Sequence, residues 1–177
     1  DLCDESALAA LGLALQDSAA VGWHAGSPDA AAGRPVRNPA DHGDVVGTVY
    51  EVTEGSARAA VARASRSNWS QVPVTERADK LERAAELLQE RMPVLIGLAV
   101  REAGKSVANA ISEVREAIEF LRYYAAQART TFGPAQFPLG PVVCISPWNF
   151  PLAIFTGQVA AALVAGNPVL AKPAEET

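Results

Sequence analysis

The sequence predicts an α/β protein in which a helical region leads into a strand–helix–strand unit. The apolar run from Val142 to Ile145 is rich in β-branched residues and typical of a strand buried on both faces. A helical pattern follows from about Leu152 to Ala165, and a second apolar run, Val169 to Ala171, leads to Lys172. The two strands are therefore expected to be parallel and joined by a right-handed crossover.

The first fifty residues predict one helix and two short strands. Leucines and alanines at helical spacing over residues 2–20 indicate a peripheral helix. Residues 21–34, rich in Gly, Ala and Pro, are expected to form a loop. Residues 35–41 and 45–51 indicate two strands around an Asp/Gly turn.

Helical patterns fill the middle of the chain, from Thr53 to about Ala128. Residues that commonly begin helices precede each pattern: Thr53, Thr75, Pro93, and either Ser106 or Ser112. Gly104 is expected to end the third helix. The fourth carries an apolar stripe (Ile111, Val114, Ile118, Leu121, Ala125) and a charged face that is expected to be solvated, with Arg115 and Glu119 at ion-pair spacing: Glu113, Arg115, Glu116, Glu119 and Arg122.

Composition narrows the function classes. Apolar residues make up 49% and charged residues 20%, as in an ordinary soluble domain, and the net charge of −5 predicts no nucleic-acid partner through this segment. Cys3 and Cys144 are too far apart in the sequence to indicate a disulfide framework, which fits a reducing cytoplasm. No signal peptide or transmembrane segment is predicted. His24 and His42 lack ligand spacing, so no metal site is predicted.

Two polar residues follow the two predicted strands of the strand–helix–strand unit. Asn149 comes just after the first strand, and Lys172 ends the second. Ligands of such units bind where the carboxyl ends of the strands meet, so both residues are expected at one binding rim.

The segment PWNFPL…AGN…KPAE resembles the cofactor-binding core of the aldehyde dehydrogenase superfamily. The longer stretch CISPWNFPLAIFTGQVAAALVAGNPVLAKPAE is closer still to the L-glutamate-γ-semialdehyde (Δ1-pyrroline-5-carboxylate) dehydrogenase module of bifunctional proline utilization proteins. The resemblance implies the N-terminal part of an aldehyde dehydrogenase fold, with the first strand–helix–strand of a Rossmann-like NAD-binding domain.

The same resemblance divides the chain into an N-terminal helix and linker, residues 1–34, and an incomplete NAD-binding domain, residues 35–177. The family's dimerisation hairpin is expected to be missing or shortened near residues 129–139. The family's nucleophilic cysteine, general-base glutamate and nicotinamide-site glycine motif are expected beyond Thr177.

The resemblance also assigns roles to residues. Asn149 would donate a hydrogen bond to the oxyanion; the alternative from the residue type alone is a helix cap. Lys172 and Glu175 would bind the adenosine ribose, and the Glu175 carboxylate would favour NAD over NADP. The remaining residues of the cofactor groove would be Ile145, Ser146, Pro147 and Trp148.

Substrate contacts are implied for three further residues. Phe150 and Ile154 would face the aldehyde, and Glu116 would approach its amino end, although an exposed helix glutamate is the simpler interpretation. Cys144 lies within an apolar strand and is interpreted as a buried hydrophobe rather than a nucleophile.

The function implied for the parent enzyme is NAD-dependent oxidation of L-glutamate-γ-semialdehyde to glutamate in proline catabolism. FAD would belong only to a proline dehydrogenase domain upstream. The parent is expected to be a cytoplasmic homo-oligomer, and the isolated chain to be inactive. The alternatives are another NAD-dependent (semi)aldehyde dehydrogenase, and a non-catalytic remnant that binds a nucleotide or a partner.

Overall fold

The computed structural model describes residues 3–26 and 33–177. In chain order its elements are α1 (Glu5–Ala19), β1 (Trp23–Ala25), β2 (Arg34–Arg37), β3 (Val45–Val49), α2 (Glu54–Ala64), the 3₁₀ turn η1 (Trp69–Gln71), α3 (Val74–Glu90), α4 (Met92–Ala103), α5 (Val107–Thr131), β4 (Val142–Ile145), α6 (Ala153–Val164) and β5 (Val169–Lys172).

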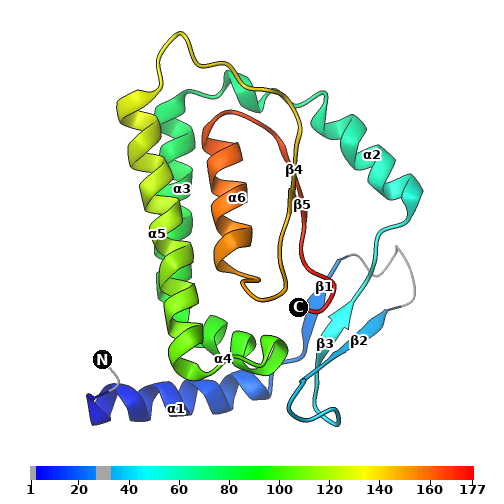
Figure 1. The fold of residues 1–177 in the computed structure, drawn as a ribbon, viewed down its shortest axis with the longest axis vertical. Coiled ribbons are helices and arrows are strands. Elements are labelled where there is room, and N and C mark those ends of the chain that lie inside the picture. Colours follow the sequence, from blue (N-terminus) through cyan, green and yellow to red (C-terminus); the bar gives the residue numbers. More distant parts are fainter. Residues whose placement is uncertain (1–2, 27–32) are drawn as a thin grey trace.

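Helices α1, α3, α4, α5 and α6 form one packed group, and α2 lies apart from it, beyond strands β4 and β5 (Figure 1). Helix α5 packs against α3 and against α6, and α1 packs against α4. Helix α6 lies between α5 and the β4–β5 pair (Figure 1). The chain is therefore an α/β structure, as the sequence predicts.

The predicted strand–helix–strand unit is confirmed, but β4 is not buried on both faces, since Val143 and Ile145 are 60% and 63% exposed. Strands β4 and β5 are parallel, with Ile145 opposite Lys172 in the register. The backbone N–H of Ser146 donates to the Lys172 carbonyl at 3.0 Å and extends the pairing by one step. Gly166, with φ of 88°, follows the end of α6 in the left-handed region, which glycine commonly adopts just after a helix.

The two predicted N-terminal strands are also confirmed, since β2 pairs antiparallel with β3. The loop predicted for residues 21–34 is wrong in part, because Trp23–Ala25 forms β1 and pairs parallel with β3. Gly47, opposite Trp23, permits this pairing, since a Cβ there would lie 2.3 Å from the Trp23 carbonyl oxygen. Residues 27–32 of the predicted loop lie outside the described residues.

Most of the predicted helix ends are confirmed. The Thr53 hydroxyl accepts from the Ser56 N–H at 3.2 Å, and the Ser106 hydroxyl accepts from the Asn109 N–H at 3.3 Å. The cap predicted at Thr75 is wrong: α3 begins at Val74, after Pro73, and no side chain caps it. The fixed φ of proline suits an extended residue before a helix, so the chain enters α3 two residues early.

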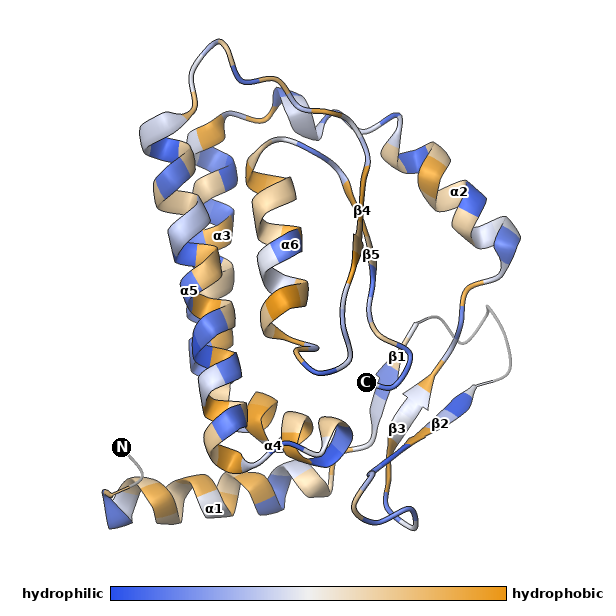
Figure 2. Cartoon of the chain, viewed as in Figure 1, coloured by the Kyte–Doolittle hydropathy of each residue, from blue (hydrophilic) through white to orange (hydrophobic). Residues whose placement is uncertain are grey.

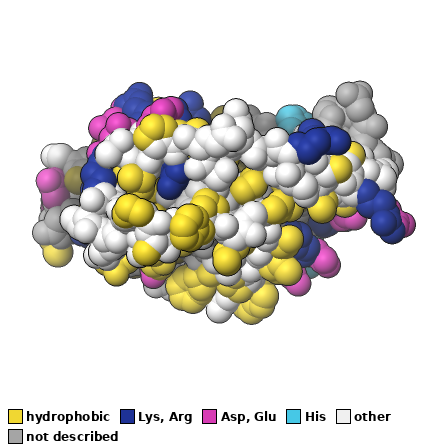
Figure 3. Space-filling model, turned by 90° about the horizontal axis from the view of Figure 1, so that it is seen from above, with side chains coloured by type: hydrophobic (Ala, Val, Ile, Leu, Met, Phe, Trp, Pro, Cys, Tyr) yellow, Lys and Arg dark blue, Asp and Glu magenta, His cyan; other side chains and the backbone are white. Residues whose placement is uncertain are grey.

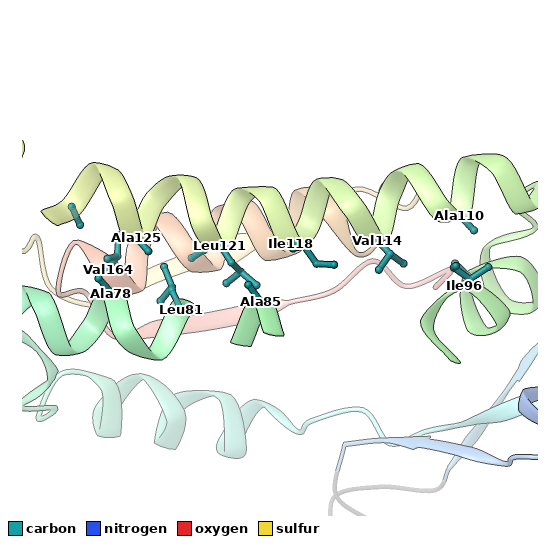
Figure 4. Close-up of a cluster of buried hydrophobic side chains, with 13 residues drawn as sticks. Ala78, Leu81, Ala85, Ile96, Ala110, Val114, Ile118, Leu121, Ala125 and Val164 are labelled. Atoms are coloured by element: carbon teal, nitrogen blue, oxygen red, sulfur yellow. The ribbon is translucent and has the colours of Figure 1, made fainter. Parts of the chain in front are cut away.

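The apolar stripe of α5 forms the core with α3, α4 and α6 (Figure 4). Val114, Ile118, Leu121 and Ala125 are buried as predicted, and Ile111 is half-buried. Alanines on α3 and α5 (Ala78, Ala85, Ala125 and Ala128) are fully buried, which allows these helix backbones to approach closely.

Helix α6 is apolar along most of its length (Figure 2), so the polar groups at its buried ends need partners. At its C-terminal end, Arg77 Nε donates to the Val164 carbonyl at 2.9 Å, and Arg77 Nη1 donates to Val72 O. Trp69 Nε1 donates to Leu163 O at 2.8 Å. Burial lowers the pKa of Arg77 below its usual value, but arginine remains charged at neutral pH.

The Arg77→Met variant should lower the free energy of unfolding by about 1–3 kcal/mol, because it leaves buried carbonyl oxygens without a donor. Urea denaturation followed by circular dichroism measures this difference. Arg83→Met, on the same helix, is the matched control: Arg83 is exposed and paired with Glu86, so a change within about 0.5 kcal/mol is expected. Equal effects of the two substitutions would contradict the bridging role of Arg77.

Candidate functional site

The carboxyl ends of β4 and β5 form a rim that brings the predicted residues together. Ile145 and Lys172 end the two paired strands. The turn 146–152 follows β4, and the loop with Glu175 follows β5. The prediction that the Asn149 turn and Lys172 share one edge of the sheet is therefore confirmed.

Asn149 lies in the turn between β4 and α6, with its side chain exposed. It is not a helix cap, because α6 begins at Ala153 and Leu152 holds the N-cap position. The expectation that Asn149 sits at the helix N-terminus is wrong, since three residues separate it from Ala153, where α6 begins. Its side-chain amide makes no hydrogen bond to another described residue, so both amide hydrogens can reach a ligand.

The first N–H groups of α6 bind Glu113 instead. Glu113 Oε1 accepts from the N–H of Leu152 at 2.8 Å and from that of Ala153 at 3.3 Å. The expectation that Glu113 lies on the solvated face of α5 is wrong, because the residue is 1% exposed. The position borders the apolar stripe and faces the start of α6, where a carboxylate complements the helix dipole.

The other charged residues of that face are exposed, as expected: Arg115, Glu116, Glu119 and Arg122. The ion pair expected between Arg115 and Glu119 is not the one observed. Glu119 pairs with Arg122 instead, at 3.6 Å.

Lys105 joins Glu113 to the Asn149 turn, and sequence reasoning missed it. Lys105 Nζ lies 2.6 Å from Glu113 Oε2 and donates to the Asn149 carbonyl oxygen at 2.8 Å. The ammonium also lies 4.8 Å from the centre of the Phe150 ring. The one available signal was its position directly after the helix-ending Gly104, which carries the chain from α4 to α5.

Lys172 and Glu175 form an exposed pair at the other side of the rim. Lys172 Nζ donates to Glu175 Oε1 at 3.3 Å. Arg34 of β2 donates to the Glu175 carbonyl at 3.1 Å and thereby ties this loop to the N-terminal sheet. A neighbouring ammonium donor and carboxylate acceptor can bind the two hydroxyls of a ribose.

The remaining predicted residues surround these groups in different ways. Ile145 and Trp148 expose 63% and 60% of their surface at the rim. Ser146 is buried, with its hydroxyl donating to Pro147 O at 3.3 Å. Ile154 is half-buried on α6, and Phe150 is exposed beside Lys105.

Other features of the described residues do not add to this site. A pocket of about 470 Å³ is lined by residues of α1, α3, α4 and α5 and includes none of the rim residues. No helix in the described part of the chain is both long and apolar enough to cross a membrane. Over residues 3–26 and 33–177, no group of three or more His, Cys, Asp or Glu side chains is placed to hold a metal ion.

Cys144 is buried in β4, and burial raises the pKa of its thiol because the thiolate loses solvation. A protonated thiol beneath the strand surface is a poor nucleophile, in agreement with the interpretation of Cys144 as a small hydrophobe.

Comparison with known proteins identifies relatives over the whole chain. Residues 26–177 match the model of the aldehyde dehydrogenase family. The bifunctional protein PutA of Rhizobium meliloti is 61% identical over 182 residues, which cover 100% of this chain and 15% of that protein. The chain thus spans about 15% of the length of this curated relative.

Solved structures of 1-pyrroline-5-carboxylate dehydrogenases share the fold. A mutant of the Thermus thermophilus enzyme superposes with a TM-score of 0.91 at 34% identity, covering 97% of this chain and 38% of that one. The Thermus enzyme with bound NAD gives a TM-score of 0.88 at 33% identity, with the same coverage.

Cys144 should react with iodoacetamide at neutral pH at least about ten times more slowly in the folded protein than in urea, because folding buries the thiol and disfavours the thiolate. Peptide mass spectrometry over a time course measures both rates. Since the pKa is raised, labelling of the folded protein should increase only when the pH exceeds the ordinary thiol pKa. Fast labelling at neutral pH would restore Cys144 as a candidate nucleophile.

Proposed function

Since the chain belongs to the aldehyde dehydrogenase family, we propose that its parent enzyme oxidises L-glutamate-γ-semialdehyde to glutamate with NAD, in proline catabolism. The observation that carries the proposal is the shared rim, where the Asn149 turn and the Lys172–Glu175 pair follow two paired strands. The names of the relatives, PutA and 1-pyrroline-5-carboxylate dehydrogenase, support this substrate.

Asn149 would supply the oxyanion hydrogen bond. When a nucleophile attacks an aldehyde carbon, negative charge develops on the carbonyl oxygen, and an oriented amide N–H stabilises that charge. Because Glu113 already binds the first N–H groups of α6, the stabilisation would come from the Asn149 amide rather than from the helix dipole. The family's nucleophilic cysteine and general base would be supplied by other parts of the parent enzyme.

The Lys172–Glu175 pair would bind the adenosine ribose of NAD, which supplies the hydride acceptor. The Glu175 carboxylate can accept from a ribose hydroxyl, and Lys172 can donate to one. The exposed Trp148 and Ile145, with Ser146 and Pro147 between them, would form the adjoining wall of the groove.

Phe150 and Ile154 would contact the aldehyde, because both follow Asn149 toward α6. Glu116, exposed on α5, would approach the amino end of the substrate. The isolated 177 residues should not oxidise the aldehyde, since Cys144 is buried and neither the nucleophile nor the base is assigned within them. FAD would belong to an upstream proline dehydrogenase domain of the parent.

We further propose that the parent is a cytoplasmic homo-oligomer. The segment between α5 and β4 leaves Phe137 80% exposed and Leu139 92% exposed. Hydrophobic side chains are spread over this end of the molecule (Figure 3). Contact with another part of the assembly would remove such side chains from water. The residues 132–141 that make up this segment form no strand.

The Asn149→Ala variant of the parent enzyme should lower kcat on the order of 100- to 1000-fold, because one oxyanion donor is lost. The KM for NAD should change little. Steady-state NAD reduction with glutamate semialdehyde measures both. Asn109→Ala is the matched control, since Asn109 is exposed on α5 and should leave kcat unchanged. A near wild-type kcat for Asn149→Ala would remove the oxyanion role.

The Glu175→Gln variant should shift the ratio of kcat/KM for NAD to that for NADP toward NADP. At 4 Å and an effective dielectric of about 20, two unit charges repel by roughly 4 kcal/mol, and the Lys172 ammonium beside Glu175 offsets part of this. We therefore expect a shift of about tenfold, equivalent to about 1.4 kcal/mol.

Two further variants control the cofactor test. Glu176→Gln, at the adjacent exposed position, should leave the NAD:NADP ratio unchanged. Lys172→Ala should weaken both cofactors, because it removes a donor that either ribose would use. An unchanged ratio in Glu175→Gln would show that its carboxylate does not face the ribose 2′ position.

A further inference from the structure

We propose that Lys105 and Glu113 are positioning residues for Asn149, acting as one buried unit that fixes the backbone on both sides of its amide. This inference rests on the oxyanion role proposed for Asn149. It adds two residues from the α4–α5 connection and α5, remote in sequence from the PWNFPL segment, to the machinery of the site.

The contacts lie at both ends of the turn. Lys105 Nζ holds the carbonyl oxygen of Asn149 itself, at 2.8 Å. Glu113 Oε1 holds the N–H groups of Leu152 and Ala153, at 2.8 and 3.3 Å. The residues between these points belong to no helix or strand, so their conformation depends on anchors from outside the turn. Fixing the peptide groups on each side restricts where the Asn149 side chain can point.

Burial makes the two charges interdependent. The Glu113 side chain is 1% exposed and that of Lys105 is 13% exposed. Glu113 Oε2 accepts no hydrogen bond among the described residues, and its partner is the Lys105 ammonium, 2.6 Å away in an ion pair. Removing the ammonium would leave a buried carboxylate uncompensated. Glu113 would then shift and weaken its hold on the start of α6, so Lys105 acts on the turn both directly and through Glu113.

The same ammonium also reaches the proposed substrate wall. Its 4.8 Å distance from the Phe150 ring centre fits a cation–π contact, which favours one ring orientation. One cation thus restrains the proposed oxyanion donor and its neighbour, which would contact the aldehyde. A catalytic group misplaced by about 1 Å can lose on the order of 100-fold in rate, so such restraint has a measurable consequence.

The first test uses kinetics of the parent enzyme. Lys105→Met and Glu113→Gln should each lower kcat by about 10- to 100-fold while the KM for NAD changes little. Lys105→Arg, which retains the charge and donors, should recover much of the loss. Lys80→Met is the control, because Lys80 forms an exposed ion pair with Glu76 on α3.

A double-mutant comparison separates positioning from a general structural role. Because Lys105 acts through Asn149, Lys105→Met should cause little further loss of kcat in the Asn149→Ala background. A loss of the same size in both backgrounds, or an unchanged kcat in the single variants, would overturn the proposal.

The second test needs no enzymatic activity. Amide hydrogen exchange of the peptide covering residues 149–156 should become faster in Lys105→Met and in Glu113→Gln, but not in Lys80→Met. Unchanged exchange in that peptide would also overturn the proposal. If exchange becomes faster while the parent oxidises no aldehyde, the positioning role of Lys105 and Glu113 is supported and the proposed function fails. The two failures are therefore distinguishable.

Discussion

The structure depends on the burial of α6 with a charged partner at each end. An apolar helix inside a helical layer carries unpaired N–H groups at its start and unpaired carbonyls at its end, and these cannot remain unsatisfied in the interior. Glu113 accepts from the first, and Arg77 donates to the last. A carboxylate at the N-terminus and a guanidinium at the C-terminus also complement the helix dipole. Helix α6 is therefore held in one axial position between α5 and the β4–β5 pair.

The axial position of α6 determines the geometry of the candidate site. The turn that carries Asn149 spans only the gap between β4 and the start of α6, so its shape follows from where α6 begins. At the opposite end, Asn167 Oδ1 accepts from the N–H groups of Leu139 and Gly140, at 2.6 and 3.1 Å, and aligns the entry to β4. Burying an ion pair contributes little net stability. Its effect here is geometric, because it sets the register of the helix against the sheet edge.

The local features of the fold could be predicted from the sequence, while its long-range polar contacts could not. Gly104, Ser106 and the alternation of strand, helix and strand are local signals, and each is confirmed. Glu113 was predicted to be a surface residue because its neighbours along α5 are charged. Its burial depends on packing against α6, which lies nearly forty positions later in the sequence. Strand β1 was not predicted for the same reason, because it forms by pairing with β3, and other residues separate the two in the sequence.

The candidate site shows the same division. The resemblance identified which residue types meet at the rim, because they lie in one contiguous motif that ends two adjacent strands. It did not identify Lys105, which reaches the motif from the connection between two helices. A lysine after a glycine is unremarkable in a sequence, and its role appears only when its ammonium is placed beside a buried carboxylate and a backbone carbonyl.

The exposure of the rim residues shows that the described residues do not by themselves exclude water from the candidate site. Hydride transfer and thioester chemistry require a site from which water is excluded, because competing hydrolysis is otherwise fast. Trp148 and Ile145 are more than half exposed, so the described residues provide one wall of such a site and not an enclosure. In the proposed enzyme the opposing wall would carry the nucleophile.

The two walls would then have to meet with the Asn149 amide already oriented, because an amide on an unrestrained turn would have to be ordered in each catalytic cycle. A donor held in advance by Lys105 and Glu113 would avoid that cost. This explains why two charges with little exposure lie beside a turn that exposes Trp148, Asn149 and Phe150.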